Sequence, residues 1–138
     1  MQHYDTSEVD ASLLRLAHIG FVPFDDPRML ATVARIEQTL LRDGLPLRYR
    51  TESGVDGLLG DEHPFLACAF WLGENYAHGG RLADAEALMG RLVGLANDIG
   101  LLSEEYDVVN ARHMGNTPQS LSHLALVRAA DAIASARV

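Results

Sequence analysis

The chain has 138 residues, of which 48% are hydrophobic, and a formal net charge of −8 at pH 7. This length and composition are typical of a single globular domain with a real core, here over residues 1–138. The acidic balance disfavours nucleic acid and anionic membranes as partners, because both require clustered Lys and Arg. Cys68 stands alone, so a disulfide framework is excluded. Without an apolar stretch of membrane-spanning length or a signal-peptide pattern near Met1, we expect a cytoplasmic protein.

Two amphipathic helices are predicted in the first third of the chain. Residues 7–18 place apolar side chains at helical spacing and are followed by Gly20, which favours a helix end. Residues 26–43 repeat the pattern over a longer stretch, and Asp43-Gly44 is expected to close this helix. The N-terminal signals are Ser7 or Asp10 for the first helix, and Asp26 followed by Pro27 for the second.

Residues 44–62 form a long segment rich in glycine and charged side chains between two predicted helices. Loops of this length in compact domains are usually functional or disordered. Arg48-Tyr49-Arg50 offers hydrogen-bond donors and an aromatic face, which fits ligand binding. A surface loop held by salt bridges explains the same composition equally well.

A pair of antiparallel helices is predicted next. The third helix begins at Pro64 and is apolar on every side through Leu72, which indicates burial on all sides. Trp71 is therefore expected in the core. After Gly79-Gly80, residues 82–97 show one apolar stripe, typical of an outer helix that returns along the third because the link is short.

An acidic cluster follows in residues 100–107, with the sequence GLLSEEYD. It lies between a helix end at Gly100 and a helix start at Asn116-Thr117-Pro118, and catalytic carboxylates are often presented from such loops. A solvated loop in an acidic protein is the simpler interpretation. Residues 108–116 are expected to form a turn or small hairpin. Thr117 is the expected cap of the last helix, which buries Leu121, Leu124, Ala125, Ala129 and Ile133.

These patterns predict an all-α architecture of five main helices with elaborated loops before the third and the fifth. Inner and outer helices alternate, so both loops precede buried helices and can open at the same end. That arrangement is typical of a site at one mouth of a helical barrel or toroid.

The polar residues of these loops favour acid–base chemistry by carboxylates, since Glu104 and Glu105 are adjacent and a glycosidase needs two such groups. A metal site is the weaker alternative: His63, His113 and His123 lie near loops or helix starts, but none has a recognised ligand spacing. Neither a serine-nucleophile motif nor a glycine-rich phosphate loop is present. We therefore expect neither a metal nor a cofactor.

Several words of the sequence together resemble glycoside hydrolase family 15, the group of glucoamylases, glucodextranases and bacterial trehalases. They are LRYR at 47–50, EHPFLACAFWL at 62–72, GRL at 80–82, NDIGLLSEEYD at 97–107 and GNTPQSLSHLAL at 115–126. The resemblance covers nearly all of this chain but only the C-terminal part of the family's catalytic domain. It implies a partial (α/α)6 barrel and inverting hydrolysis of an α-glucoside substrate in carbohydrate metabolism.

The same resemblance implies roles for individual residues. Glu104 takes the position of the general base, Glu105 lies near the sugar, Arg48 hydrogen-bonds the sugar and Tyr49 is its neighbour in the loop. Trp71 matches a helix position where packing is expected. The family's general acid belongs to an upstream segment that this sequence lacks.

We therefore expect the isolated chain to be inactive. Its expected partners are the missing N-terminal portion of the domain or a second copy, since a partial toroid leaves apolar faces uncovered. The alternatives are a helical-repeat interaction module and a carbohydrate-binding remnant without turnover. The Trp71-Leu72-Gly73 motif with Tyr76 suggests the former, but its spacing departs from the tetratricopeptide pattern.

Overall fold

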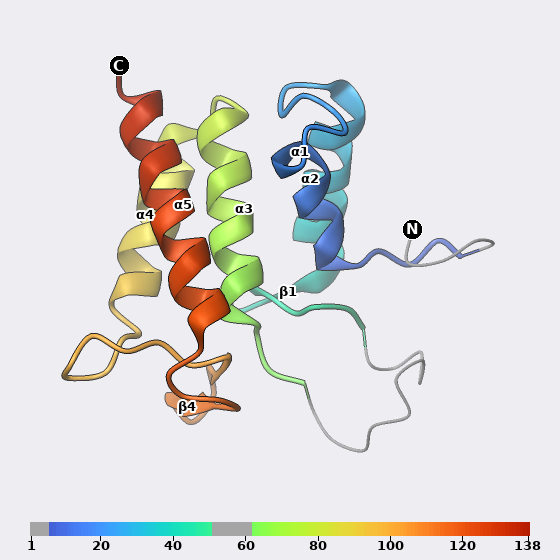
Figure 1. The fold of residues 1–138 in the computed structure, drawn as a ribbon. Helices are drawn as coiled ribbons and strands as arrows, with labels where there is room; N and C mark the ends of the chain where they lie inside the picture. Colours follow the sequence, from blue (N-terminus) through green and yellow to red (C-terminus); the bar gives the residue numbers. More distant parts are fainter. Residues whose placement is uncertain (1–5, 51–61) are drawn as a thin grey trace.

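The computed structural model describes residues 6–50 and 62–138, and these are mostly helical (Figure 1). Within these residues, five α-helices, as predicted, and two short antiparallel hairpins follow one another. In the described part, no helix combines the length and apolarity needed to cross a membrane. Figure 1 shows α3 between α4 and α5 on one side and α1 and α2 on the other.

The first predicted helix begins later than expected. A 3-10 turn, η1 (Ala11–Leu14), leads into the short helix α1 (Arg15–His18). Asp10 is the cap, because its Oδ1 accepts the backbone N–H of Ser12 at 2.7 Å. Of the two candidate caps, the structure therefore selects Asp10.

Helix α2 (Pro27–Leu40) begins as predicted, with the Asp26 side chain accepting the N–H of Arg28 at 2.8 Å. The prediction of its C-terminus was wrong: α2 ends at Leu40, and Asp43-Gly44 instead forms the turn between β1 (Leu41–Arg42) and β2 (Leu45–Pro46). Both turn residues have positive φ, +46° and +71°. Asp-Gly favours this two-residue hairpin, because glycine and aspartate tolerate the left-handed backbone that the turn requires.

Helix α3 (Leu66–His78) is the centre of the packing. All but two of its residues are buried, and it packs against η1, α4 and α5. Phe70 and Leu72 are among the most deeply buried side chains, and the free thiol of Cys68 is also enclosed. The prediction of burial on all sides is confirmed. A helix that is apolar on every face removes all of that surface from water only when it lies between other elements.

Helix α4 (Leu82–Val93) buries Ala85, Leu88 and Leu92, partly buries Leu82 and Met89, and exposes its other face, as predicted for an outer helix. It forms a hairpin with α3 through the short link at Gly79-Gly80 (Figure 1).

Helix α5 (Ser120–Ala136) is rotated from its predicted orientation. Leu121 and Leu124 are 38% and 64% exposed, so their predicted burial was wrong, whereas small residues face the core. Ser122 lies on the buried face, and its hydroxyl donates to the carbonyl of Ser103 at 2.8 Å. Two features determine the orientation of α5 about its axis. One is this hydrogen bond, and the other is the close approach to α3 that small side chains permit. The buried residues are Ser122, Ala125, Ala129, Ala132 and Ile133.

The start of α5 also differs from the prediction. Gln119, and not Thr117, is its N-cap, and its side chain accepts the N–H of Leu121 at 3.4 Å. The Thr117–Pro118 peptide is cis and precedes the helix. Pro118 therefore lies in the connection and not in the first turn.

The two elaborated loops meet at the N-terminal end of α3. The acidic segment forms β3 (Glu105–Asp107), which pairs with β4 (Arg112–Met114). The backbone N–H of Leu66 donates to the carbonyl of Glu104 at 3.0 Å, and Phe65 donates to Pro46 of β2 at the same distance. The prediction that both loops lie at one end of the helices is confirmed for their described parts (Figure 1).

Candidate active site

Arg48 links the first loop to the acidic segment. Its Nε donates to Glu62 Oε1 at 2.6 Å, and its Nη2 lies 3.8 Å from Glu105 Oε1. The guanidinium also lies 5.4 Å from the ring centroid of Tyr49 and 5.2 Å from that of Phe65, within cation–π range. Residues 48, 49 and 105, which sequence reasoning singled out, are thus close together, while residues 51–61 of the first loop lie outside the described part.

Glu105 is a partly buried carboxylate whose side chain is 18% exposed. Burial raises the pKa of Glu105, and the nearby Arg48 guanidinium opposes that shift. The carbonyl of Glu105 accepts the hydroxyl of Ser103 at 2.6 Å, which fixes the backbone before β3. The side chain is therefore placed to face Arg48 at the end of α3.

Glu104 precedes β3 and is half-buried, so its carboxylate is accessible to solvent. Its Oε2 accepts two hydrogen bonds from Asn116, one from the backbone N–H at 3.2 Å and one from Nδ2 at 2.8 Å. Its own N–H donates to the Asn116 carbonyl at 2.9 Å. Glu104 can thus present a carboxylate in a defined orientation, one residue before Glu105, whose side chain faces Arg48.

The third acid of the segment, Asp107, has a different role. It is 2% exposed and accepts hydrogen bonds from the side chain of Asn110 at 2.7 Å and from two backbone N–H groups of the following turn. With Arg112 also donating to it, these bonds lower the pKa of Asp107 to about 2. Asp107 therefore stabilises the β3–β4 turn.

Sequence reasoning assigned no role to Glu62 or Asn116. Glu62 lies against Arg48 with a side chain that is 6% exposed, and Asn116 binds the carboxylate of Glu104. The sequence did contain a signal for Glu62, because it is an acidic residue directly before the buried helix, within the motif EHPF. Asn116 gave no such signal, because its partner lies twelve residues away and only the hairpin brings them together.

The three histidines considered as metal ligands have separate partners. His63 Nδ1 lies 4.0 Å from Asp107 Oδ1, and His113 Nε2 lies 2.7 Å from the carbonyl of Leu95. His123 Nε2 accepts the N–H of Leu102 at 3.1 Å. Across residues 6–50 and 62–138, no group of three metal-ligating side chains is found.

A groove of about 760 Å³ lies next to the acidic loop, at the N-terminal end of α5. Its walls include Asn116 and His123, together with the exposed apolar side chains of Leu124 and Val127. The groove thus connects the hairpin that carries Glu104 to the uncovered face of α5.

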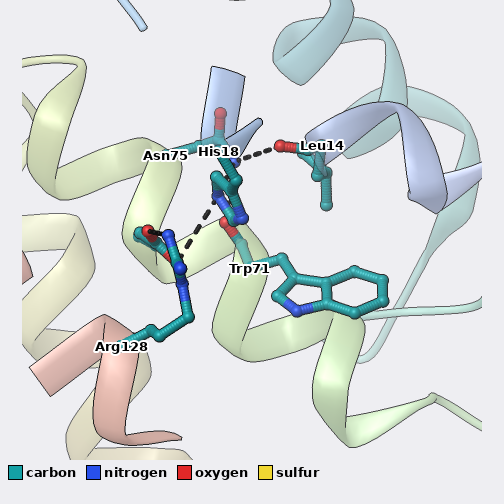
Figure 2. A network of polar contacts seen from close by, with 6 residues as sticks. Leu14, His18, Trp71, Asn75 and Arg128 are labelled. Carbon is teal, nitrogen blue, oxygen red and sulfur yellow. Dashed lines mark hydrogen bonds and ion pairs between the residues drawn. The ribbon is translucent and has the colours of Figure 1, made fainter. Parts of the chain in front are cut away.

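A second polar cluster, which the sequence did not indicate, is buried among the helices (Figure 2). Glu74 accepts Arg128 Nη2 at 2.9 Å and lies 3.5 Å from Nε2 of His18, whose side chain is fully buried. Burial lowers the pKa of His18 to about 4, against the opposing effect of Glu74. Asn75 donates to the carbonyls of Leu14 and Trp71 at 3.1 and 2.8 Å. The cluster joins α1, α3 and α5.

Trp71 lies beside this cluster on α3 (Figure 2). It is only partly buried, so the predicted core position is not fully met, but it packs against the core as expected, and the guanidinium of Arg15 lies 5.0 Å from its ring centroid.

Comparison with known proteins gives consistent matches over nearly the whole chain. The trehalase of Mycolicibacterium smegmatis is 44% identical over 128 residues, which are 93% of this chain and 19% of that protein. The trehalase of Thermoplasma acidophilum is 45% identical over 131 residues, 94% of this chain and 22% of that protein. The chain therefore spans about a fifth of the length of these curated relatives.

Solved structures of a glycosidase share the fold. The wild-type enzyme superposes with a TM-score of 0.79 at 24% identity, and a variant in complex with glucose with a TM-score of 0.80 at 25% identity. Each match covers 94% of this chain and 37% of the solved chain. The sequence model of glycosyl hydrolases family 15 matches residues 1–131, and the chain belongs to that family.

Proposed function

We propose that this chain forms the C-terminal part of a family-15 catalytic domain that hydrolyses an α-glucoside, with Glu104 as the general base. The observation that supports this most directly is the geometry of Glu104. It is half-buried, its carboxylate is oriented by two hydrogen bonds from Asn116, and it directly precedes Glu105, whose side chain faces Arg48. The names of the curated relatives point to trehalose as the substrate, and the solved glycosidase variant with glucose points to a glucosyl group.

In this proposal Glu104 removes a proton from a water molecule as the water oxygen attacks the anomeric carbon of the sugar. A general acid on the other side protonates the departing glycosidic oxygen, which gives inversion. The two carboxyl groups of such a pair stand about 6.5–9.5 Å apart to leave room for the water. Glu104 supplies one of them, and the other comes from a part of the family's domain that does not align with these 138 residues.

Arg48, Tyr49 and Glu105 bind the sugar in this proposal. Arg48 offers N–H donors to hydroxyl groups, and Tyr49 offers an aromatic face beside it. Glu105 is a poorer candidate for the base than Glu104, since burial and the neighbouring Arg48 guanidinium commit its carboxylate to an internal contact. Glu105 instead holds Arg48 in place and accepts hydrogen bonds from the sugar.

The partial (α/α)6 barrel is the architecture that fits this proposal. Three apolar residues of α5, Leu121, Leu124 and Val127, are at least 38% exposed and follow one another at a spacing of three. In a complete toroid these side chains pack against the preceding part of the domain. In the isolated chain they favour self-association, and sedimentation that shows only a monomer would contradict that expectation.

A chimera tests the proposal. This chain replaces the matching segment of the Mycolicibacterium smegmatis trehalase, and glucose release from trehalose is measured. Glu104→Gln is expected to lower kcat at least about 100-fold, because it removes the proton acceptor but keeps the side-chain shape. Glu86→Gln, on an exposed carboxylate paired with Arg137 just after α5, is the matched control with unchanged activity.

Two further outcomes discriminate the alternatives. An active chimera that tolerates Glu104→Gln would overturn the assignment of the base. Calorimetric binding of a glucoside without any turnover in the chimera would favour the carbohydrate-binding alternative. The isolated 138-residue chain is expected to release no glucose from trehalose or maltose.

A further inference from the structure

Asn116 contacts Glu104 through three polar groups: its backbone N–H, its backbone carbonyl and its side-chain Nδ2. Its backbone N–H and its Nδ2 both donate to Glu104 Oε2, at 3.2 and 2.8 Å. Its carbonyl accepts the N–H of Glu104 at 2.9 Å. The main-chain bond fixes the position of Glu104, and the two bonds to Oε2 fix the plane of its carboxylate.

Gly115 completes the arrangement from the opposite direction. A Cβ atom at position 115 would lie 2.9 Å from Oε2 of Glu104, closer than real Cβ atoms approach, and 3.0 Å from its Cβ, which is tighter than nine in ten real contacts. The backbone at Gly115 also has φ of +70°, which L-residues rarely adopt. Glycine is thus required twice, once by its own backbone conformation and once by the carboxylate that packs against it.

We propose that Gly115 and Asn116 are positioning residues that aim the carboxylate of Glu104 at the attacking water. This proposal rests on the proposed function, in which Glu104 is the base. Asn116 occupies Oε2, whereas in the part of the chain that the structure describes no hydrogen bond reaches Oε1. Oε1 therefore accepts the proton: its new O–H bond forms as the O–H bond of the water breaks. The water oxygen bonds to the anomeric carbon as the glycosidic C–O bond breaks, and the departing oxygen takes a proton from the general acid.

A purely structural role for the Asn116 side chain is the competing explanation. The main-chain bond between the Asn116 carbonyl and the Glu104 N–H already ties the end of the hairpin to the acidic segment without any side chain. The amide donates instead to the reactive carboxylate. A carboxylate that is free to rotate loses alignment with the water, and small misalignments of reacting groups lower rates by up to about 100-fold.

The experiment uses the same trehalase chimera. Asn116→Ala is expected to lower kcat about 10- to 100-fold with KM changed less than about twofold, because orientation of the base acts on the transition state and not on substrate binding. Gly115→Ala is expected to act in the same direction. The matched control is Asn110→Ala, which removes the same amide from the neighbouring carboxylate of Asp107 and is expected to leave kcat unchanged.

Asn116→Asp provides a second variant of nearly identical shape in case Asn116→Ala does not fold. It places a second carboxylate beside the base, so the acid limb of the kcat–pH profile is expected to move to higher pH. An unmoved acid limb would show that the side chain of residue 116 does not contact the base in the active enzyme.

The outcomes separate the two proposals. If Glu104→Gln retains activity, the proposed function fails. If Glu104→Gln abolishes activity but Asn116→Ala stays within twofold of the parent kcat, or Asn116→Asp leaves the acid limb in place, only the positioning role is overturned.

Discussion

Two clusters in this chain combine an arginine with buried acids, and they differ in access to solvent. At the end of α3, Arg48 contacts Glu62 and Glu105, and the next residue back, the half-buried Glu104, is held by Asn116. Among the helices, Arg128 contacts Glu74, which is 3% exposed and lies next to the fully buried His18.

The difference follows from the elements that carry each cluster. Loops and short strands build the first cluster at an edge of the helical layer, so a carboxylate can be held firmly and still reach a ligand. Three packed helices enclose the second cluster, so its charges serve to join α1, α3 and α5 (Figure 2). The same side chains therefore suit catalysis in one place and packing in the other.

The largest expected effect on stability comes from breaking the enclosed cluster. Glu74→Ala is expected to lower the free energy of unfolding by about 3 kcal/mol, because it leaves Arg128 and His18 without their buried partner. The value lies at the low end for buried pairs, since Arg128 is 49% exposed and can reach water. Urea unfolding measures it. The control Glu86→Ala breaks an exposed pair with Arg137 and should cost about 0.5 kcal/mol; equal losses would refute the contrast.

The second prediction concerns pH and His18. Burial lowers the pKa of His18 to about 4, so between pH 6.5 and 4 the unfolded chain binds a proton that the folded chain does not. The free energy of unfolding therefore falls as the pH drops through that window, by on the order of 2 kcal/mol. His18→Gln should remove this part of the pH dependence in urea titrations at pH 7, 5.5 and 4.5. Parallel curves for both proteins would show that His18 is not the group responsible.

The smallest expected effect comes from the loop cluster. Burial raises the pKa of Glu105, so the ionised side chain does not stabilise the folded state. Any contribution of Glu105 to the free energy of unfolding comes from its protonated form and is lost as the pH rises through the folded-state pKa. Glu105→Gln is therefore expected to change the free energy of unfolding at pH 7 by less than about 1 kcal/mol. A loss comparable to that of Glu74→Ala, measured in the same urea titration, would mean that the loop cluster also stabilises the fold.

Local sequence signals predicted a helix start correctly where the capping residue lies directly beside the first turn in the sequence. Asp26-Pro27 places α2 correctly, because the cap and the first turn are contiguous in sequence. The same signals failed at Asp43-Gly44 and at Thr117-Pro118. In each case a nearby strand or bend, absent from the local pattern, competes for the same residues.

The candidate site was found from sequence only in part. The family resemblance assigned roles to four residues that the structure describes at one end of α3. They are Arg48, Tyr49, Glu104 and Glu105. Asn116 escaped notice because its importance lies in a hydrogen bond across a hairpin, which no spacing in the sequence encodes.

The sequence by itself determined which segments are helical and that α3 is buried. Both follow from where the apolar residues fall along the chain, since each apolar side chain favours the protein interior over water. Only the tertiary structure decided which face of α5 is exposed and which acid is held by Asn116, and that Glu74 joins three helices. These features depend on contacts between residues as far apart in the chain as His18 and Glu74, and their energies exist only once the chain is packed.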